Sequence, residues 1–459
     1  MRETVGSESE VSACMQALTH FVAASSGRVL PEEVATKGKL HLLDTLASMI
    51  SGTALKPGQT AIKFGAREAG GGRASIVGTP HRVPPVTAAF VNAILAHSDE
   101  TDDSHAASVT HPGCAVVPCA LAFAEVHDRS GMDLLNAVVT GYEIAARINM
   151  ALDPDALRAR GFGPHSIGGT WGAGAAAGAL SGLTATQLRA VFSYVGQQTA
   201  GMNCWMRDRQ HILKAFSFGG MPSRSGAFAV EMVANDFTGI DDILAGRGGF
   251  FFAFADNPRP EMIGEALGSE FRIMGTAIKK WTVGSPIQAP LDSLLALMKQ
   301  HGIGPADVAK IRVRISDTLV RTVNNREMSD ISLQHCLALM LVDGTVTFAS
   351  SHDHERTHDP KVSAARALVE VVPDTELTAA RPPRQAIVEV DTKDGRSLAH
   401  RTYAVRGTPG DPMTTEEVVE KALDLTVPII GRARAEAFVK MVLTVDGLDD
   451  ANSLRKYWA

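Results

Sequence analysis

The sequence of 459 residues predicts a mostly α-helical protein that carries one smaller α+β domain. Three observations support this fold class. Apolar residues recur at helical spacing through residues 1–270, whereas apolar and polar residues alternate at 311–316 and 387–391. Helical spacing then returns near the C-terminus. Because the chain is also too long for one ordinary domain, we predict a large all-α domain of residues 1–270 and 406–459, discontinuous in sequence, and an α+β domain of residues 271–405.

The first part of the chain carries one helix pattern after another. Between residues 31 and 54, apolar side chains recur every three or four positions, Pro31 fits the first turn and Gly52 fits the end. A capping-box pattern, Thr184 followed three residues later by Gln187, opens another helix. Further helices are predicted at residues 10–26, 61–69, 86–95, 115–126, 132–148, 161–182, 184–200, 225–235 and 240–245. We expect a break at Gly219-Gly220-Met221-Pro222.

The alternating segments are typical of half-buried strands. Residues 397–405 can pair with residues 387–391 across the turn Lys393-Asp394-Gly395. Helices are predicted between the strands at residues 290–301, 332–342 and 360–371, and beyond them at 414–426 and 432–443. The last two helices must bury their apolar faces, and we expect them to pack against the first domain.

Composition argues against several classes of protein. The net charge is −6 and no block of Lys and Arg is present, so nucleic acid is not expected as a partner. No segment reaches the roughly 18–20 apolar residues of a membrane span. Residues 1–4 include an acid and no apolar signal core, which favours a cytoplasmic location. The five cysteines form no C-x-x-C pair, so disulfides, a zinc ribbon and an iron–sulfur cluster are not expected.

The stretch from His97 to His111 holds four acids and three histidines within fifteen residues, between two apolar helix patterns. Two interpretations remain open. One is a solvated loop. The other is a helix end and loop that direct an acid, a hydroxyl and an imidazole into a cleft, a set suited to proton transfer near neutral pH. His97 and His105 are expected to orient this loop.

The segment Gly161–Gly182 is rich in Gly and Ala. Its glycines miss the G-x-G-x-x-G spacing and no convincing strand precedes them, so we reject a dinucleotide-binding loop. Small residues that let two helices approach closely are the better interpretation.

Several short motifs occur in a fixed order along most of the chain. They are Ala96-His97-Ser98, Asp102-Asp103-Ser104, His111-Pro112-Gly113, Gly141-Tyr142-Glu143, Gly161-Phe162, Phe237-Thr238-Gly239, Gly246-Arg247-Gly248-Gly249-Phe250 and Lys279-Lys280-Trp281. Together they resemble the MmgE/PrpD family, which includes dehydratases, decarboxylases and epimerases of small polycarboxylates. The resemblance implies an all-α domain completed by the C-terminal tail, an α+β lid, a homodimer, and no metal or other cofactor.

The resemblance also implies Glu100, Ser104, His111, Lys214 and Lys279 as residues of the site. His165, on the Gly-rich segment, is a further candidate acid or base, so the expected catalytic set is Glu100, His111, His165, Lys214 and Lys279. Glu100 stands where relatives usually carry Asp. Two further departures concern histidines. Gly163-Pro164 replaces a usual His-Pro pair, with His165 two residues later, and Gln288 replaces a histidine of the small domain. The substrate-binding set is expected to comprise Ser104, Tyr142, Arg147, Arg207, Arg224, Gln288 and His335.

The family substrates carry an acidic C–H beside a carboxylate, and removal of that proton builds negative charge that cations must stabilise. We therefore expect a lyase that dehydrates a 2-methylcitrate-like hydroxy-polycarboxylate. An epimerase or isomerase and a decarboxylase are alternatives on the same scaffold. Two other classes stay open: a metal enzyme with Asp102, Asp103, His105 and His111 as ligands, and a non-catalytic homologue.

Overall fold

The computed structural model describes residues 11–458, and most of them are helical. The expectation drawn from the first four residues therefore lies outside the described part. The helices of the first half are α1 (Ala13–Ala23), α2 (Glu32–Gly52), α3 (Lys56–Gly65), α4 (Pro85–Ala96), α5 (Pro112–Val126), α6 (Gly131–Leu152), α7 (Pro154–Ala159), α8 (Pro164–Leu180), α9 (Ala185–Gln198), α10 (Ile212–Ala215), α11 (Met221–Ala234), α12 (Phe250–Phe254) and α13 (Glu261–Gly264). Among the described helices, none combines the length and apolarity needed to cross a membrane.

Close helix packing forms the centre of this helical body. Helices α5, α6, α8 and α11 are largely buried and pack against one another. A Cβ placed on Gly172 would lie 2.6 Å from the carbonyl oxygen of Gly141, so the two backbones nearly touch. The Gly/Ala-rich segment is thus a packing helix, as its composition indicates.

Two predictions for this region are wrong. Residues 240–245 form no helix. The Asp242 carboxylate accepts hydrogen bonds from the backbone N–H groups of Leu244 and Ala245, a local turn that competes with helical bonding. The expected break at Gly219-Gly220 is instead a π-helical turn, Phe216–Gly220, that joins α10 to α11 without interruption.

The α+β region carries one four-stranded sheet in the order β6-β5-β7-β8. Strand β5 pairs in parallel with β6, and the other pairs are antiparallel. Its strands and helices are α14 (Gln288–His301), β5 (Val308–Ser316), α15 (Asp317–Val323), α16 (Leu333–Asp343), α17 (Phe348–His352), α18 (Pro360–Ala367), β6 (Val369–Asp374), α19 (Thr375–Ala379), β7 (Ala386–Thr392) and β8 (Ser397–Thr402). The helix predicted to reach residue 371 therefore ends earlier, because Val369 and Val371 pair with β5.

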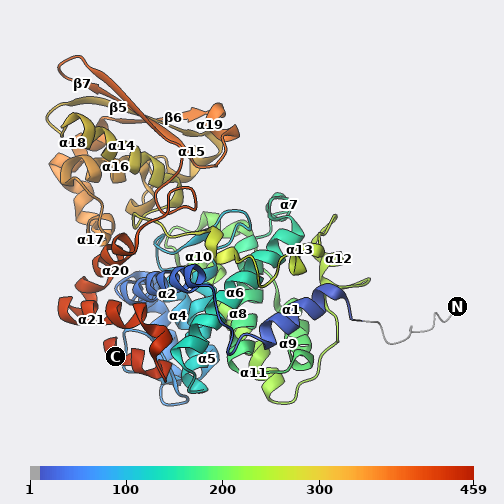
Figure 1. Cartoon of the computed structure of the whole chain (residues 1–459). Coiled ribbons are helices and arrows are strands. Elements are labelled where there is room, and N and C mark those ends of the chain that lie inside the picture. Colours follow the sequence, from blue (N-terminus) through green and yellow to red (C-terminus); the bar gives the residue numbers. More distant parts are fainter. Residues whose placement is uncertain (1–10, 459) are drawn as a thin grey trace.

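The C-terminal tail returns to the helical body. Helices α20 (Thr415–Ile430) and α21 (Arg432–Leu443) lie beside α2, while the sheet extends away from the body (Figure 1). Two hydrophobic cores occur among residues 11–458, and the tail side chains Leu425 and Phe438 belong to the larger one. Ile278 also belongs to the larger core and Trp281 to the smaller, so we propose the first domain boundary between them rather than at residue 270.

Candidate active site

The acid- and histidine-rich stretch joins the end of α4 to the start of α5. His97 is the C-cap of α4, and His111 directly precedes Pro112, the first residue of α5. Pro at the first helical position is favourable because its missing N–H would have no partner there. Residues Asp99–Asp103 are all buried, so the solvated-loop interpretation is wrong. Val109 adopts φ 51°, a strained conformation for a β-branched residue.

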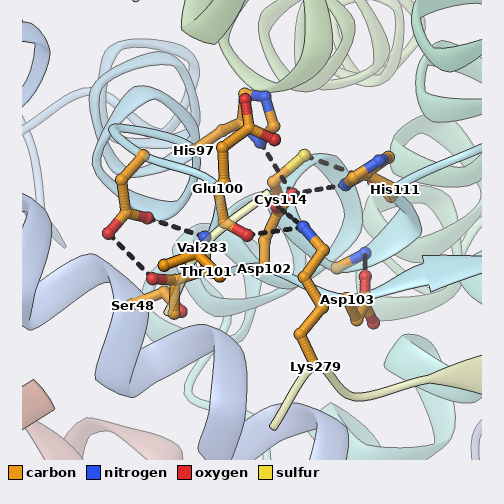
Figure 2. Close-up of polar contacts among 12 residues, drawn as sticks. Ser48, His97, Glu100, Thr101, Asp102, Asp103, His111, Cys114, Lys279 and Val283 are labelled. Carbon is orange, nitrogen blue, oxygen red and sulfur yellow. Dashed lines mark hydrogen bonds and ion pairs between the residues drawn. The ribbon is translucent and has the colours of Figure 1, made fainter. Parts of the chain in front are cut away.

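The Asp102 carboxylate is the centre of the cluster. Its Oδ2 accepts hydrogen bonds from Nδ1 of His97 at 2.8 Å and from Nδ1 of His111 at 3.1 Å. The Lys279 ammonium lies 3.5 Å from Oδ1 (Figure 2). A carboxylate only accepts hydrogen bonds, so each Nδ1 carries the proton. In a neutral ring with this arrangement, Nε2 keeps a free lone pair.

His111 and His165 lie together against one aromatic ring. Their ring centroids are 5.2 Å apart, and His165 stacks on Phe218 at 4.0 Å. Burial lowers the pKa of His111 to about 4, although Asp102 opposes the shift. Burial likewise holds the pKa of His165 well below its usual value. Both imidazoles are thus neutral at pH 7 and able to accept a proton.

Two lysines reach the cluster from distant segments. Lys214, on α10, forms an ion pair with Oε1 of Glu100. Lys279 donates a hydrogen bond of 2.5 Å to the backbone carbonyl of Glu100. Lys214 retains 15 % side-chain exposure, Glu100 10 % and His111 9 %, so these three side chains keep some contact with solvent and form the accessible edge of the cluster.

Glu100 is a carboxylate rather than a proton donor. Burial would raise its pKa, but Lys214, His211 and Lys279 lower it well below its usual value. Nδ1 of His211 lies 3.8 Å from the same carboxylate oxygen that pairs with Lys214. Glu100 is therefore a carboxylate paired with Lys214 in this structure.

The residues predicted to be catalytic lie together in one cluster. Those predicted to bind substrate do not all lie in it. Glu100, His111, His165, Lys214 and Lys279 form one cluster through the contacts above. Ser104 lies beside it on β3 (Ser104–His105), where its backbone pairs with Ala277 of β4 (Thr276–Ala277).

Tyr142, Arg147 and Gln288 have polar contacts within the fold, and their predicted part in substrate binding stays a prediction. The Tyr142 hydroxyl donates to Oδ2 of Asp103 at 2.5 Å, and the tyrosine is almost fully buried. Arg147 pairs with Glu143 and donates to backbone carbonyls around α13. The Gln288 side chain bonds the backbone of residues 281 and 283, which fixes the segment that follows Lys279.

Arg207, Arg224 and His335 take no part in the polar contacts of the cluster. Arg207 is exposed, and Arg224 is exposed beside Phe228 on α11. His335 is buried on α16, a helix that packs in the smaller core. None of these side chains forms a hydrogen bond or ion pair with Asp102, Glu100 or the two lysines within residues 11–458.

The four ligands of the metal hypothesis do not form one group in the described part of the chain. Asp103 bonds His41 and Tyr142, and His105 bonds Ser108. A different trio, His97, Asp102 and Cys114, lies close enough to share an ion. However, the Cys114 thiol donates to the His111 carbonyl, burial keeps its pKa well above the usual value, and Lys279 already places a cation there. These donors do not favour a metal ion.

Comparison with known proteins decides the family. The MmgE/PrpD N-terminal domain matches residues 16–263, and the MmgE/PrpD C-terminal domain matches residues 281–446. The chain belongs to the MmgE/PrpD family. The resemblance stated from the motifs is thereby confirmed.

Curated relatives within the MmgE/PrpD family share about a quarter of their residues with this chain. The cis-aconitate decarboxylase of Homo sapiens is 26 % identical over 446 residues, which cover 93 % of this chain and 90 % of the human protein. That of Mus musculus is 25 % identical, with 93 % and 89 % covered. That of Aspergillus terreus is 22 % identical, with 95 % and 94 % covered. These are lyase-type enzymes, and the prediction of a lyase-type enzyme is confirmed at that level.

Several side chains of this MmgE/PrpD site were missed at the sequence level. Phe218 stacks on both His97 and His165, and it lies on the π-helical turn that was predicted as a break. Lys421, on the distant helix α20, donates to the Thr101 carbonyl at 2.9 Å. No spacing in the sequence signals either contact, because both depend on segments that meet only in the folded chain.

Proposed function

We propose that this member of the MmgE/PrpD family is a cofactor-independent decarboxylase of a small unsaturated tricarboxylate, of the cis-aconitate type. The observation that carries the proposal is the convergence of Lys214 and Lys279 with two neutral imidazoles on one buried cluster. The names of the curated relatives favour decarboxylation over the dehydration expected from the sequence.

The two ammonium groups suit a substrate with several carboxylates. Lys214 can exchange Glu100 for a substrate carboxylate at the accessible edge, while Lys279 supplies a second positive charge in the interior. Electrostatic contacts are stronger where water is excluded, so charge that develops on the reacting carbons is stabilised there.

The reaction breaks the carbon–carbon bond to one carboxylate, and CO₂ leaves. The electron pair of that bond passes to the remaining carbon framework, where a second carboxylate delocalises it. One proton is then added to carbon, so each turnover consumes one proton.

His111 is the residue we assign to the proton transfer. Asp102 holds its Nδ1–H, so Nε2 faces the accessible edge. A bound polycarboxylate raises the pKa of this imidazole by adding negative charge, which favours a protonated Nε2 in the complex. His165 is the second candidate, 5.2 Å away between ring centroids.

The test is a substrate screen in D₂O with product mass recorded. We expect cis-aconitate to release CO₂ and to give a dicarboxylate that carries one carbon-bound deuteron. Loss of water from 2-methylcitrate would instead establish the dehydratase. Deuterium in recovered substrate of unchanged composition would indicate an epimerase, and no turnover of any di- or tricarboxylate would refute the proposal.

Three finer expectations are retained as proposals. Metal independence predicts full activity after dialysis against a chelator. A homodimer, implied by the family, predicts a mass of two chains in light scattering. A cytoplasmic location is tested by cell fractionation.

A further inference from the structure

We propose that His352 is a positioning residue of this site: from the α+β region it holds Asp99, and through Asp99 it fixes the backbone that presents Glu100 and Asp102. The inference rests on the proposed function for its kinetic readout, but its structural readout is independent of any substrate.

The contacts of His352 require a charged imidazolium. Nδ1 lies 2.9 Å from the backbone carbonyl of Phe348, which only accepts, so Nδ1 carries a proton. Nε2 lies 3.2 Å from Oδ2 of Asp99, within ion-pair distance. A neutral ring would point its Nε2 lone pair at a carboxylate. The geometry therefore calls for protons on both nitrogens.

Asp99 in turn holds the loop between α4 and α5, which we call the catalytic loop, through Thr101. Its Oδ1 accepts from the Thr101 backbone N–H at 2.9 Å, and its Oδ2 accepts from the Thr101 hydroxyl at 2.8 Å. Between these residues lies Glu100, whose carbonyl binds Lys279. Asp99 is buried, so without His352 its carboxylate would keep a negative charge in the interior without that cation.

The other end of α17 is fixed to the helical body. The Phe348 backbone N–H donates to Oδ2 of Asp424, on α20, at 2.7 Å. Lys421, three residues earlier on α20, binds the Thr101 carbonyl. Helices α17 and α20 therefore hold the same short loop from two sides, the first through Asp99 and the second through Thr101.

Several charged groups face His352. Asp99 lies on the catalytic loop, Asp424 on α20, and Asp330 on the turn Ser329–Ile331, which is tied to α17 by the bond of 2.5 Å from Ser329 Oγ to the Ser351 carbonyl. Burial alone would lower the pKa of His352, but Asp99 and Asp330 raise it to about 9. The imidazolium is thus the form present at neutral pH.

Two isosteric variants separate the contacts of the ring. His352→Asn keeps an N–H group at the Nδ1 position and removes the Asp99 contact. His352→Gln keeps an N–H group at the Nε2 position without charge. His358→Asn, an exposed histidine six residues away, is the matched control. Hydrogen exchange of the amides of residues 98–105 is measured on the full chain without substrate.

We expect His352→Asn to increase exchange in that loop and to lower kcat about 10- to 100-fold, with the smaller change in KM. His352→Gln should restore most of the activity and remove the loss of kcat above about pH 9. If His352→Asn matches His358→Asn in exchange and kcat, the inference is wrong. Should His352→Asn fail to fold, Asp99→Asn carries the test, with the same expected increase in loop exchange.

The two proposals fail differently. If no polycarboxylate is turned over by the unaltered protein, the proposed function fails, while the exchange data still decide whether His352 holds the loop. If turnover occurs and the loop is indifferent to residue 352, only this inference fails.

Discussion

The helical body and the α+β region differ in where their ion pairs lie: several are buried in the body, whereas those on the sheet are exposed to water. In the body, Asp44, Asp102 and Lys421 are buried and paired with one another or with histidines. On the sheet, Arg312 bonds Glu389 and Asp391 across strands β5 and β7, at a surface that water reaches. Buried charges cost several kcal/mol of desolvation each. The buried ionic groups of the body therefore depend on their partners for stability, whereas the exposed ion pairs of the sheet contribute little.

The largest expected effect concerns His111, in the buried cluster of the helical body. Replacing His111 with Ala should lower kcat about 10²- to 10⁴-fold, because a positioned general acid or base contributes that much. The assay is CO₂ release from cis-aconitate at saturating substrate. An unchanged thermal midpoint is the control for folding, and retention of more than a tenth of the activity would contradict the assignment.

A large loss of stability is expected when a buried pair is broken on one side only. Lys421 Nζ lies 2.6 Å from Oδ1 of Asp44, and both residues are buried. Lys421→Met should destabilise the fold by about 3–5 kcal/mol, since it leaves a buried carboxylate without its cation. Urea unfolding followed by circular dichroism measures this.

The matched control is the double variant Asp44→Asn/Lys421→Met, which removes both charges. It should recover a large part of the lost stability. Equal losses in the single and double variants would show that Lys421 acts through packing and not through its charge.

A smaller effect on the free energy of unfolding is expected when pH is raised, through the ion pair between His352 and Asp99. The pKa of His352 is raised in the folded chain to about 9, above the value of 6.5 for a free histidine. The stability from its ion pair is fully present below pH 6.5 and is lost as pH rises through 9. Up to about 3 kcal/mol should disappear over that window. Thermal unfolding of the chain and of His352→Gln between pH 6 and 10 compares the two slopes, which should differ.

The smallest effect is expected on the exposed sheet. Arg312→Met removes its bonds to Glu389 and Asp391, yet water screens these charges already. We expect the thermal midpoint and kcat to stay within experimental error. A clear loss of stability would show that the contrast between the two regions has been overstated.

Sequence patterns predicted the elements whose signal is local. The helix patterns, the alternating strands and the Thr184 capping box all depend on neighbours a few residues apart, and the structure contains these elements. Val369 and Val371 were assigned to a helix because their strand partner, β5, lies far away in the sequence. Asp242 prevented a helix through its own side chain, a competition that apolar spacing does not reveal.

The residues of the site also differ in whether a local motif in the sequence marks them. His111, Lys214 and Lys279 could be named because short motifs surround them, and the structure brings them together. Phe218, His352 and Lys421 carry no local motif. Their roles follow from contacts between segments that are up to 320 residues apart. Tyr142 and Arg147 also belong to or follow a motif, but their hydrogen bonds go to Asp103 and to Glu143 rather than to Asp102, Glu100 or the two lysines.

The bond from Lys421 to the Thr101 carbonyl has a consequence for the order in which the protein matures. Chains fold from the N-terminus as they leave the ribosome, and α4 and α5 emerge long before α20 does. The loop between them and the Asp44 carboxylate therefore lack their partner, Lys421, until translation is almost complete. A nascent chain halted after residue 405 would hold His111, Lys214 and Lys279 and still lack this fastening, so we expect catalytic competence to appear late and abruptly during synthesis.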